Sequence, residues 1–392
     1  MNLIKFEPKT QSDAQWKILS EYREIDHNKV YPILENMMLN IEQLLPGNFT
    51  GKITKEDHIS SYLGDQASYF EKIKIAMKSD NHEQNISLLY PKLLQGNYFR
   101  MNGSLYIPIL FLERSPIDVL KDPKKGNKIF INLLPTFNLT FNFQKNEVLF
   151  RKKSVELNTF MKALFKTDIE VYDDLVDAEI IEQCEYADDE RDAHVYKMMG
   201  FHETEFFSSK ELDLDTFFDE YILLDYFKGM FKDMFNIDNI KDIVKMVIKY
   251  HVDDIDINMS DIKHRRIVMN EYLINPIYEM YLRLLYGAID KNEKQAFLPT
   301  MNQRVVVTAG FRGLMHAGQY YNISLPYTNP LINKVSQDIY IINDGRIPKS
   351  WTANNPSGFG KLCPISVSAQ KMGSNLVFTN DTRINYYGKV EV

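Results

Sequence analysis

The period of the apolar residues changes along this chain, and this change limits the fold more than any other feature of the sequence. From Leu139 to Phe143, apolar and polar residues alternate, which is the period of a half-buried strand. A turn-forming run and a second apolar run follow, so a β-hairpin is predicted over 138–151. Residues 155–250 instead carry apolar residues at helical spacing. A chain that combines both periods is predicted to be an α/β mixed (α+β) protein.

Further elements are expected within this region and on either side of it. Residues 12–45 are predicted to be helical, with an N-cap at Ser12-Asp13. A second helix is predicted around 277–288, with Pro276 at its start. Strands are expected from about residue 90 onwards. A helix with one apolar face is predicted around Ile240 to Ile248.

Length and composition indicate an ordinary globular chain. The 392 residues are enough for two or three domains, and 44% are hydrophobic and 25% charged. The two cysteines, Cys184 and Cys363, are too few for a disulfide framework or a zinc site. We find no secretory signal and no apolar run of membrane-spanning length, so a cytoplasmic location is expected.

Charge is distributed unevenly. The net charge is −7, whereas a free-standing nucleic-acid binder is usually basic. Acidic residues concentrate between Asp168 and Asp261, and basic residues dominate from Lys334 to Lys389. This distribution is compatible with a subunit that has an acidic outer surface and one basic working face.

Two segments early in the chain have the character of hairpins. The run from Gly96 to Gly103 ends in Asn102-Gly103, the strongest two-residue hairpin signal, and Arg114-Ser115-Pro116 follows. The second segment is the hairpin over 138–151, with Lys152-Lys153 behind it. Each segment alone is also typical of an ordinary hairpin.

A third segment combines carboxylates with arginines. Asp253, Asp254 and Asp256 lie close together, and Arg265-Arg266 follows. Three carboxylates could hold Mg²⁺, which prefers oxygen ligands. We favour a local salt-bridge network between the aspartates and the arginines, because no further carboxylate stands at helical spacing.

The fourth segment lies near the C-terminus. It begins with Asn329-Pro330-Leu331, and its run from Phe359 to Ile365 reads Phe-Gly-Lys-Leu-Cys-Pro-Ile. A glycine-flexible loop with spaced cations can follow a phosphate backbone closely. The run is not a phosphate-binding P-loop, because Leu362 stands where a Ser or Thr would bind Mg²⁺.

Taken in order along the chain, these four segments resemble the beta subunit of cellular multisubunit RNA polymerases. The resemblance implies a multidomain fold in which residues 1–160 and 265–328 form the protrusion. Residues 161–264 would form an acidic, mainly helical lobe. Residues 329–392 would form the fork region and the start of the catalytic-core fold, which another chain completes.

The resemblance also implies a function, DNA-directed RNA synthesis, and a set of partners. The chain would be the N-terminal half of a split beta subunit, an arrangement associated with giant (jumbo) bacteriophages. Its partners would be the C-terminal half of beta, a beta-prime-like subunit that holds the catalytic Mg²⁺, a promoter-specificity factor, the DNA template and RNA. It would bind no cofactor itself, be inactive alone, and act in the cytoplasm of an infected bacterium or in the virion.

No catalytic residue is expected in this chain, and the resemblance implies nucleic-acid contacts instead. The candidates are Arg114, Arg312, Lys334, Arg346 and Lys361. An exposed Lys or Arg is also often a solvated surface charge. After Ile365 the family has a Glu-Thr-Pro-Glu-Gly-like run, whereas this chain has Ser366 to Gln370, so no role of those carboxylates carries over.

Two other classes of function stay open. The first is a phage structural or interaction protein without enzymatic activity, which would assemble with itself. The second is a single-chain nuclease or polymerase that uses the carboxylates around Asp253 with Mg²⁺. The substitution Asp253→Ala would abolish the activity of that enzyme.

Overall fold

The structure is a computed structural model. It describes residues 35–36, 38–39, 50–56, 70–78, 83–91, 99–101, 104–106, 110–121, 127–134, 137–150, 153–185, 195, 213–255, 257, 261–268, 338–341, 355–362, 375–377, 382–385 and 387–391. These residues form helices and mainly antiparallel sheets, which confirms the mixed α/β class. Within these ranges, no helix is long and apolar enough to cross a membrane.

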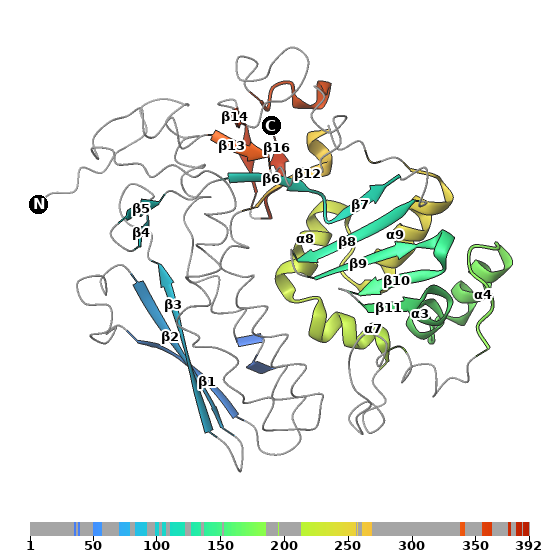
Figure 1. Cartoon of the computed structure of the whole chain (residues 1–392), viewed down its shortest axis with the longest axis horizontal. Helices are drawn as coiled ribbons and strands as arrows, with labels where there is room; N and C mark the ends of the chain where they lie inside the picture. The colour runs from blue at the N-terminus through green and yellow to red at the C-terminus, as the bar shows by residue number, and fades with distance from the viewer. Residues whose placement is uncertain are drawn as a thin grey trace, which may run out of the picture.

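A five-stranded sheet in the order β11-β10-β9-β8-β7 dominates one side of Figure 1. Its strands are Ile117–Leu120 (β7), Lys128–Leu134 (β8), Phe137–Asn142 (β9), Glu147–Phe150 (β10) and Lys153–Glu156 (β11). All neighbouring strands are antiparallel. The hairpin predicted over 138–151 is confirmed, because β9 and β10 pair from Leu139 with Phe150 to Asn142 with Glu147.

The turn of this hairpin begins earlier than the alternation predicted. Strand β9 ends at Asn142, and the 3₁₀ turn η2 (Phe143–Lys145) follows. The Asn142 side chain accepts a hydrogen bond from the Lys145 N–H at 3.3 Å, which ends the strand by capping the turn. Asn146 completes the turn at φ 51°, a left-handed conformation that Asn tolerates.

Helices accompany this sheet in sequence and in space (Figure 1). They are Leu157–Leu164 (α3), Ile169–Asp177 (α4), Leu214–Phe217 (α7), the π-helical turn Phe218–Ile222 (η3), Asp225–Phe235 (α8) and Ile240–Val252 (α9). The predicted apolar face of α9 is confirmed, because Ile240, Ile243, Val244, Val247 and Ile248 are buried. Asn239 caps this helix by accepting a hydrogen bond from the Asp242 N–H at 2.8 Å.

Aromatic rings join the sheet to the helices. Phe160 of α3 packs edge-on against Phe141 of β9 with ring centres 5.9 Å apart, and against Phe218 of η3 at 6.2 Å. Phe150 of β10 meets Phe218 at 6.1 Å. This core is continuous across residues 160 and 161, where the sequence analysis places the boundary between protrusion and lobe. That assignment of domains stays a prediction.

Strands begin earlier in the chain than the sequence analysis expected. A three-stranded antiparallel sheet consists of Thr50–Glu56 (β1), Phe70–Lys78 (β2) and Glu83–Pro91 (β3). Its signal is the alternation of Ile73, Ile75 and Met77 with lysines and alanine, the period of a strand with one polar face. The hairpin predicted at Asn102-Gly103 is confirmed, because β4 (Phe99–Met101) pairs with β5 (Ser104–Tyr106).

Two further sheets include the C-terminal strands, and the first of them brings distant segments together. The first has the order β12-β6-β13-β14 and consists of Leu110–Arg114 (β6), Arg265–Val268 (β12), Asp338–Ile341 (β13) and Asn375–Val377 (β14). The second pairs Arg383–Ile384 (β15) with Val390–Glu391 (β16). Of the helix expected over 12–45, residues 35–36 and 38–39 are helical, and the one around 277–288 lies outside the described residues.

Candidate nucleic-acid interface

The first and third segments of the resemblance lie side by side in one sheet. Strands β6 and β12 are antiparallel, and their register sets Arg265 opposite Arg114. The pairing continues past the strand end, where the Ser115 N–H donates to the His264 carbonyl at 2.8 Å. The Arg-Ser-Pro run and the paired arginines therefore lie on neighbouring strands of one sheet, although they are far apart in the sequence.

The C-terminal residues close onto the same strand. Arg266 and Lys389 form an antiparallel bridge, and the Ile267 N–H donates to the Gly388 carbonyl at 2.7 Å. Gly388 has φ 87°, and a Cβ there would lie 1.9 Å from the Ile267 carbonyl oxygen. Only glycine fits this position without displacing β12. We call the meeting place of β6, β12, residues 355–362 and residues 382–391 the junction.

The turn at 355–362 contains Phe359 to Leu362, the first part of the motif on which the predicted resemblance chiefly rests, while 363–365 lie outside the described residues. This turn is fixed at two points. Asn355 caps the short turn η6 (Pro356–Gly358) by accepting a hydrogen bond from the Ser357 N–H at 2.9 Å. The Ile262 N–H donates to the Ser357 hydroxyl at 3.0 Å, which joins the turn to the third segment. The Thr382 hydroxyl donates to the Lys361 carbonyl at 2.7 Å, which joins it to the C-terminal residues.

Lys361, a predicted nucleic-acid contact, is half-buried in the junction. Its ammonium donates a hydrogen bond to the Val390 carbonyl at 3.3 Å. The carbonyl takes one of the three N–H donors of the ammonium, and this bond joins the turn to β16.

An ionised carboxyl lies beside this turn. Burial alone would raise the pKa of Asp261, but hydrogen bonds from the Lys263 N–H and the Ser357 hydroxyl, with the nearby charges of His264 and Lys263, hold it below its usual value. The Asp261 carboxylate therefore serves to cap the turn η4 (Ile262–His264).

Polar contacts anchor the junction on helix α8. The Asn385 amide donates to the Asp233 carboxylate at 2.8 Å, and the Lys389 ammonium donates to the Asp233 carbonyl at 3.3 Å. Tyr387 lies over Gly229, where an added Cβ would be 2.1 Å from the Tyr387 hydroxyl. A side chain at position 229 would therefore require the Tyr387 ring to shift from its place on this helix.

The arginines of the third segment are buried, so they are not surface cations. Arg265 and Arg266 are each 4% exposed. Among the neighbouring aspartates, Asp254 forms an ion pair with Lys121 at 2.9 Å. Asp256, a member of the expected salt-bridge network, lies outside the described residues. No group of three or more side chains able to hold a metal ion is found in the parts of the chain that the structure describes.

Two of the five candidate nucleic-acid contacts are described by the structure, and both lie at the junction. They are Arg114, whose backbone lies in β6, and Lys361. Arg312, Lys334 and Arg346 lie outside the described residues.

The sequence analysis missed Phe359, whose side chain is 79% exposed in the turn. A signal for it exists, because an aromatic residue between Gly358 and Gly360 has no neighbouring side chain to cover it.

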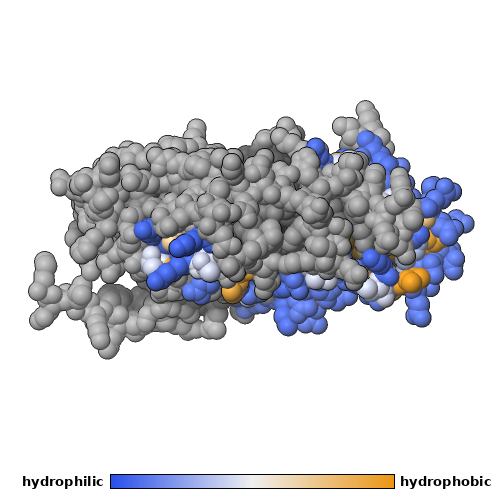
Figure 2. All heavy atoms as spheres, turned by 90° about the horizontal axis from the view of Figure 1, so that it is seen from below, coloured by the Kyte–Doolittle hydropathy of each residue, from blue (hydrophilic) through white to orange (hydrophobic). Residues whose placement is uncertain are grey.

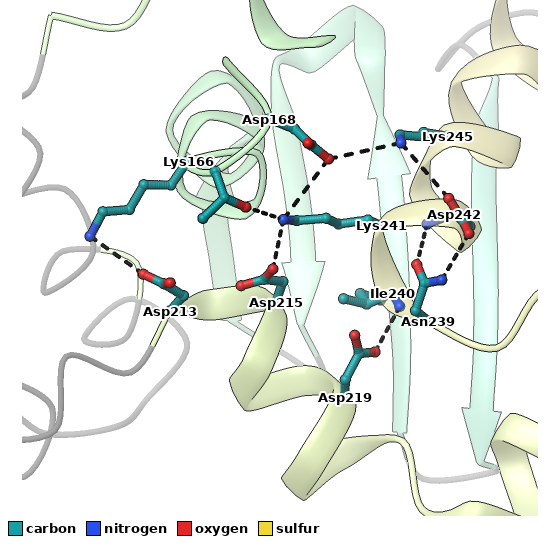
Figure 3. Close-up of polar contacts among 11 residues, drawn as sticks. Lys166, Asp168, Asp213, Asp215, Asp219, Asn239, Ile240, Lys241, Asp242 and Lys245 are labelled. Atoms are coloured by element: carbon teal, nitrogen blue, oxygen red, sulfur yellow. Dashed lines mark hydrogen bonds and ion pairs between the residues drawn. The ribbon is translucent and has the colours of Figure 1, made fainter. Parts of the chain in front are cut away.

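A second polar cluster lies between α4, α7 and α9 (Figure 3). Lys241 of α9 forms an ion pair with Asp215 of α7 at 2.6 Å and lies 4.0 Å from Asp168. Asp219 accepts a hydrogen bond from the Ile240 N–H at 2.8 Å, and burial raises its pKa to about 6. These ion pairs and hydrogen bonds join α4, α7 and α9 to one another.

The described surface has few large apolar side chains. Figure 2 shows one face on which they occur as isolated patches among hydrophilic residues.

No protein-family model matches the chain, and no curated protein matches it closely enough to count as a relative.

Proposed function

We propose that this chain is the N-terminal part of the beta subunit of a multisubunit DNA-directed RNA polymerase. In this role it shapes the DNA cleft and the fork where the strands separate. Residues 1–160 and 265–328 form the protrusion, 161–264 the lobe, and 329–392 the fork region. The chain acts wherever its template is transcribed, in the host cytoplasm or in a virion.

The meeting of separate resemblance segments at the junction carries this proposal. Arg114 lies opposite Arg265, and the turn that contains Lys361 is hydrogen-bonded to Ile262. An accidental likeness would give no reason for the matching segments to lie together. Segments that serve one cleft need to lie close to one another, because nucleic acid contacts them at the same time.

The chain contributes positioning and not the chemical step. Phosphoryl transfer depends on metal ions and on cations that hold the phosphates in line. The catalytic Mg²⁺ belongs to a beta-prime-like partner. Arg114, Arg312, Lys334, Arg346 and Lys361 contact the nucleic acid.

The direct test is to purify a tagged copy from its native cells. Mass spectrometry identifies the chains that co-purify, and a primer-extension assay on the same eluate measures RNA synthesis. We expect a chain that resembles the second half of beta, a chain with an Asp-x-Asp-Gly-Asp loop, and template-dependent RNA. The isolated chain is expected to be inactive.

A lone, inactive chain or a homo-oligomer in that experiment would contradict the proposal and favour a structural protein. Activity of the isolated chain that is abolished by Asp253→Ala would favour the single-chain enzyme. The variant Lys361→Gln tests the proposed cleft cations and should lower RNA synthesis. The control is a lysine outside the junction. Lys232→Gln removes a charge exposed on α8 and should not lower RNA synthesis.

A further inference from the structure

The most exposed large apolar side chain in the described residues lies in the turn of the junction. Phe359 is 79% exposed, compared with 63% for Ile169, 57% for Val252 and 52% for Leu39. An exposed phenyl ring forgoes the stabilisation that burial of its apolar surface would give. A ring in this position therefore calls for a ligand that covers it.

The backbone on both sides of Phe359 is held in place. Gly358 is buried, and Leu362 is 6% exposed. The Leu362 N–H donates to the Gly358 carbonyl at 2.9 Å. Gly360 turns the chain at φ 76°. The ring is thus presented from a fixed turn, so little conformational entropy is lost when a ligand binds it.

The surroundings of the ring are polar and carry positive charge. Lys361 follows it in the turn, and Lys263 lies exposed in η4, which is joined to the turn through Ser357. Two carboxylates also belong to these segments. Asp261 accepts a hydrogen bond from the Lys263 N–H at 2.9 Å, and the exposed Glu391 follows Val390, whose carbonyl binds Lys361. Pro356 and Gly360 beside the ring are also exposed. A protein partner usually covers an apolar patch with few charges at its centre. Here a single aromatic ring precedes Lys361 in the turn, and Lys263 lies in the adjoining turn η4.

We propose that Phe359 stacks on an unpaired nucleobase, with Lys361 and Lys263 facing the adjoining phosphates. A ring flanked by cations is the combination that binds single-stranded nucleic acid, because every base has a face to stack and a phosphate beside it. The inference rests on the proposed function, since a transcribing assembly separates DNA strands and releases RNA.

The test uses the full chain and short fluorescein-labelled probes of oligothymidylate and oligouridylate. Fluorescence anisotropy measures the affinity of the wild type and of the variants Phe359→Ala, Phe359→Leu and Phe359→Trp. We expect Ala and Leu to weaken binding about tenfold or more, because leucine restores apolar area but no aromatic face. Trp should retain the affinity, and its fluorescence should be quenched when either probe binds.

A matched control is Ile169→Ala, which removes an exposed apolar side chain from α4 and should leave the affinity unchanged. The variant Lys263→Gln should lower the salt dependence of binding, whereas the Phe359 variants should not, because stacking releases no counterions. Tighter binding of one probe identifies DNA or RNA as the strand at this site.

Three results would overturn the inference. They are wild-type binding by Phe359→Leu, no binding of either probe by the wild type, and loss of a co-purifying protein chain from Phe359→Ala but not from Phe359→Leu. The last result would assign the ring to a protein contact. RNA synthesis by the purified assembly is a separate measurement, so a failure of stacking leaves the proposed function standing. The absence of RNA synthesis would contradict the function itself.

Discussion

The five-stranded sheet with its helices and the junction differ in how far apart in the sequence their contacting residues lie. In the former, many polar contacts join residues close in sequence, such as Asn142 with Glu147, 5 residues apart, and Glu182 with Asn158, 24 apart, although Lys121 and Asp254 are 133 apart. In the junction, Asn385 bonds to Asp233 over 152 residues and Ile262 to Ser357 over 95. The hairpins of the core can form from local pairs, whereas the junction needs segments from the middle and the C-terminal part of the chain to arrive at one place.

The two regions also differ in what holds them together. Large buried rings fill the core, whereas glycines that allow close approach and single hydrogen bonds fix the junction. Loss of a core ring should therefore affect the whole domain. Loss of a junction contact should release the C-terminal residues and leave the sheet and helices folded.

The largest expected effect is in the core. Phe160 is 1% exposed and touches the rings of both Phe141 and Phe218, so Phe160→Ala leaves a cavity. We expect the free energy of unfolding to fall by about 3 to 5 kcal/mol. Urea denaturation followed by circular dichroism measures this change. A loss below about 1 kcal/mol would contradict the packing described here.

The second-largest effect is expected at the junction, where a substitution should lower local stability and leave the core unchanged. In Gly388→Ala the new Cβ would collide with the Ile267 carbonyl, and the positive φ adds strain. We expect local stability to fall by about 2 kcal/mol or more. Hydrogen exchange at the Ile267 N–H should become faster, while exchange in β9 and β10 stays unchanged.

Gly360→Ala is the matched control for that variant. Its φ is also positive at 76°, but nothing lies within 4 Å of an added Cβ. Only the conformational cost remains, about 1 kcal/mol. Equal effects of the two substitutions would show that the close contact between Gly388 and β12 does not exist.

A smaller effect depends on pH. Burial raises the pKa of Asp219 to about 6, so the folded chain holds this proton more tightly than the unfolded chain. The resulting stabilisation is fully present below the unfolded-state pKa of about 4 and is lost as pH rises through about 6. The carboxyl is half-buried, so we expect a change of about 1 kcal/mol.

Asp219→Asn should remove this pH dependence, because an amide does not titrate. Its oxygen can still accept the hydrogen bond from the Ile240 N–H. Urea denaturation at pH 4 and pH 7 compares the two proteins. The wild type should lose stability relative to the variant over this interval. Parallel curves would mean that the carboxyl is solvated in the folded chain.

The smallest effect is expected at the surface pair of Lys121 and Asp254. The two side chains are 33% and 72% exposed at a separation of 2.9 Å. Lys121→Gln should cost about 0.5 kcal/mol, and the difference should shrink as salt is added. Thermal denaturation at low and high ionic strength measures it, and a salt-independent loss would contradict a screened ion pair.

The sequence predicted the core better than the junction for a physical reason. The hairpin over 138–151 and the apolar face of α9 follow from local periodicity, and both are confirmed. The sheet that begins at Thr50 was missed although β2 alternates clearly, because lysines on its polar face lower its hydrophobicity.

The junction could not be predicted from periodicity, because its partners meet across long stretches of chain. Arg265 and Arg266 were expected to pair with the nearby aspartates, and the sequence could not show that both are buried in β12. Lys361 was predicted as a nucleic-acid contact, and the sequence could not show that it also bonds to Val390. Phe359 read as part of a motif, and only its exposure in the turn singles it out.

The most direct test of the central claim is an omission assay. The assembly is reconstituted from its separate chains with and without this one, and template-dependent primer extension is measured in both. Our account predicts RNA only when this chain is present, and none from this chain alone. Equal RNA synthesis without it would contradict the assignment of this chain to a transcribing enzyme.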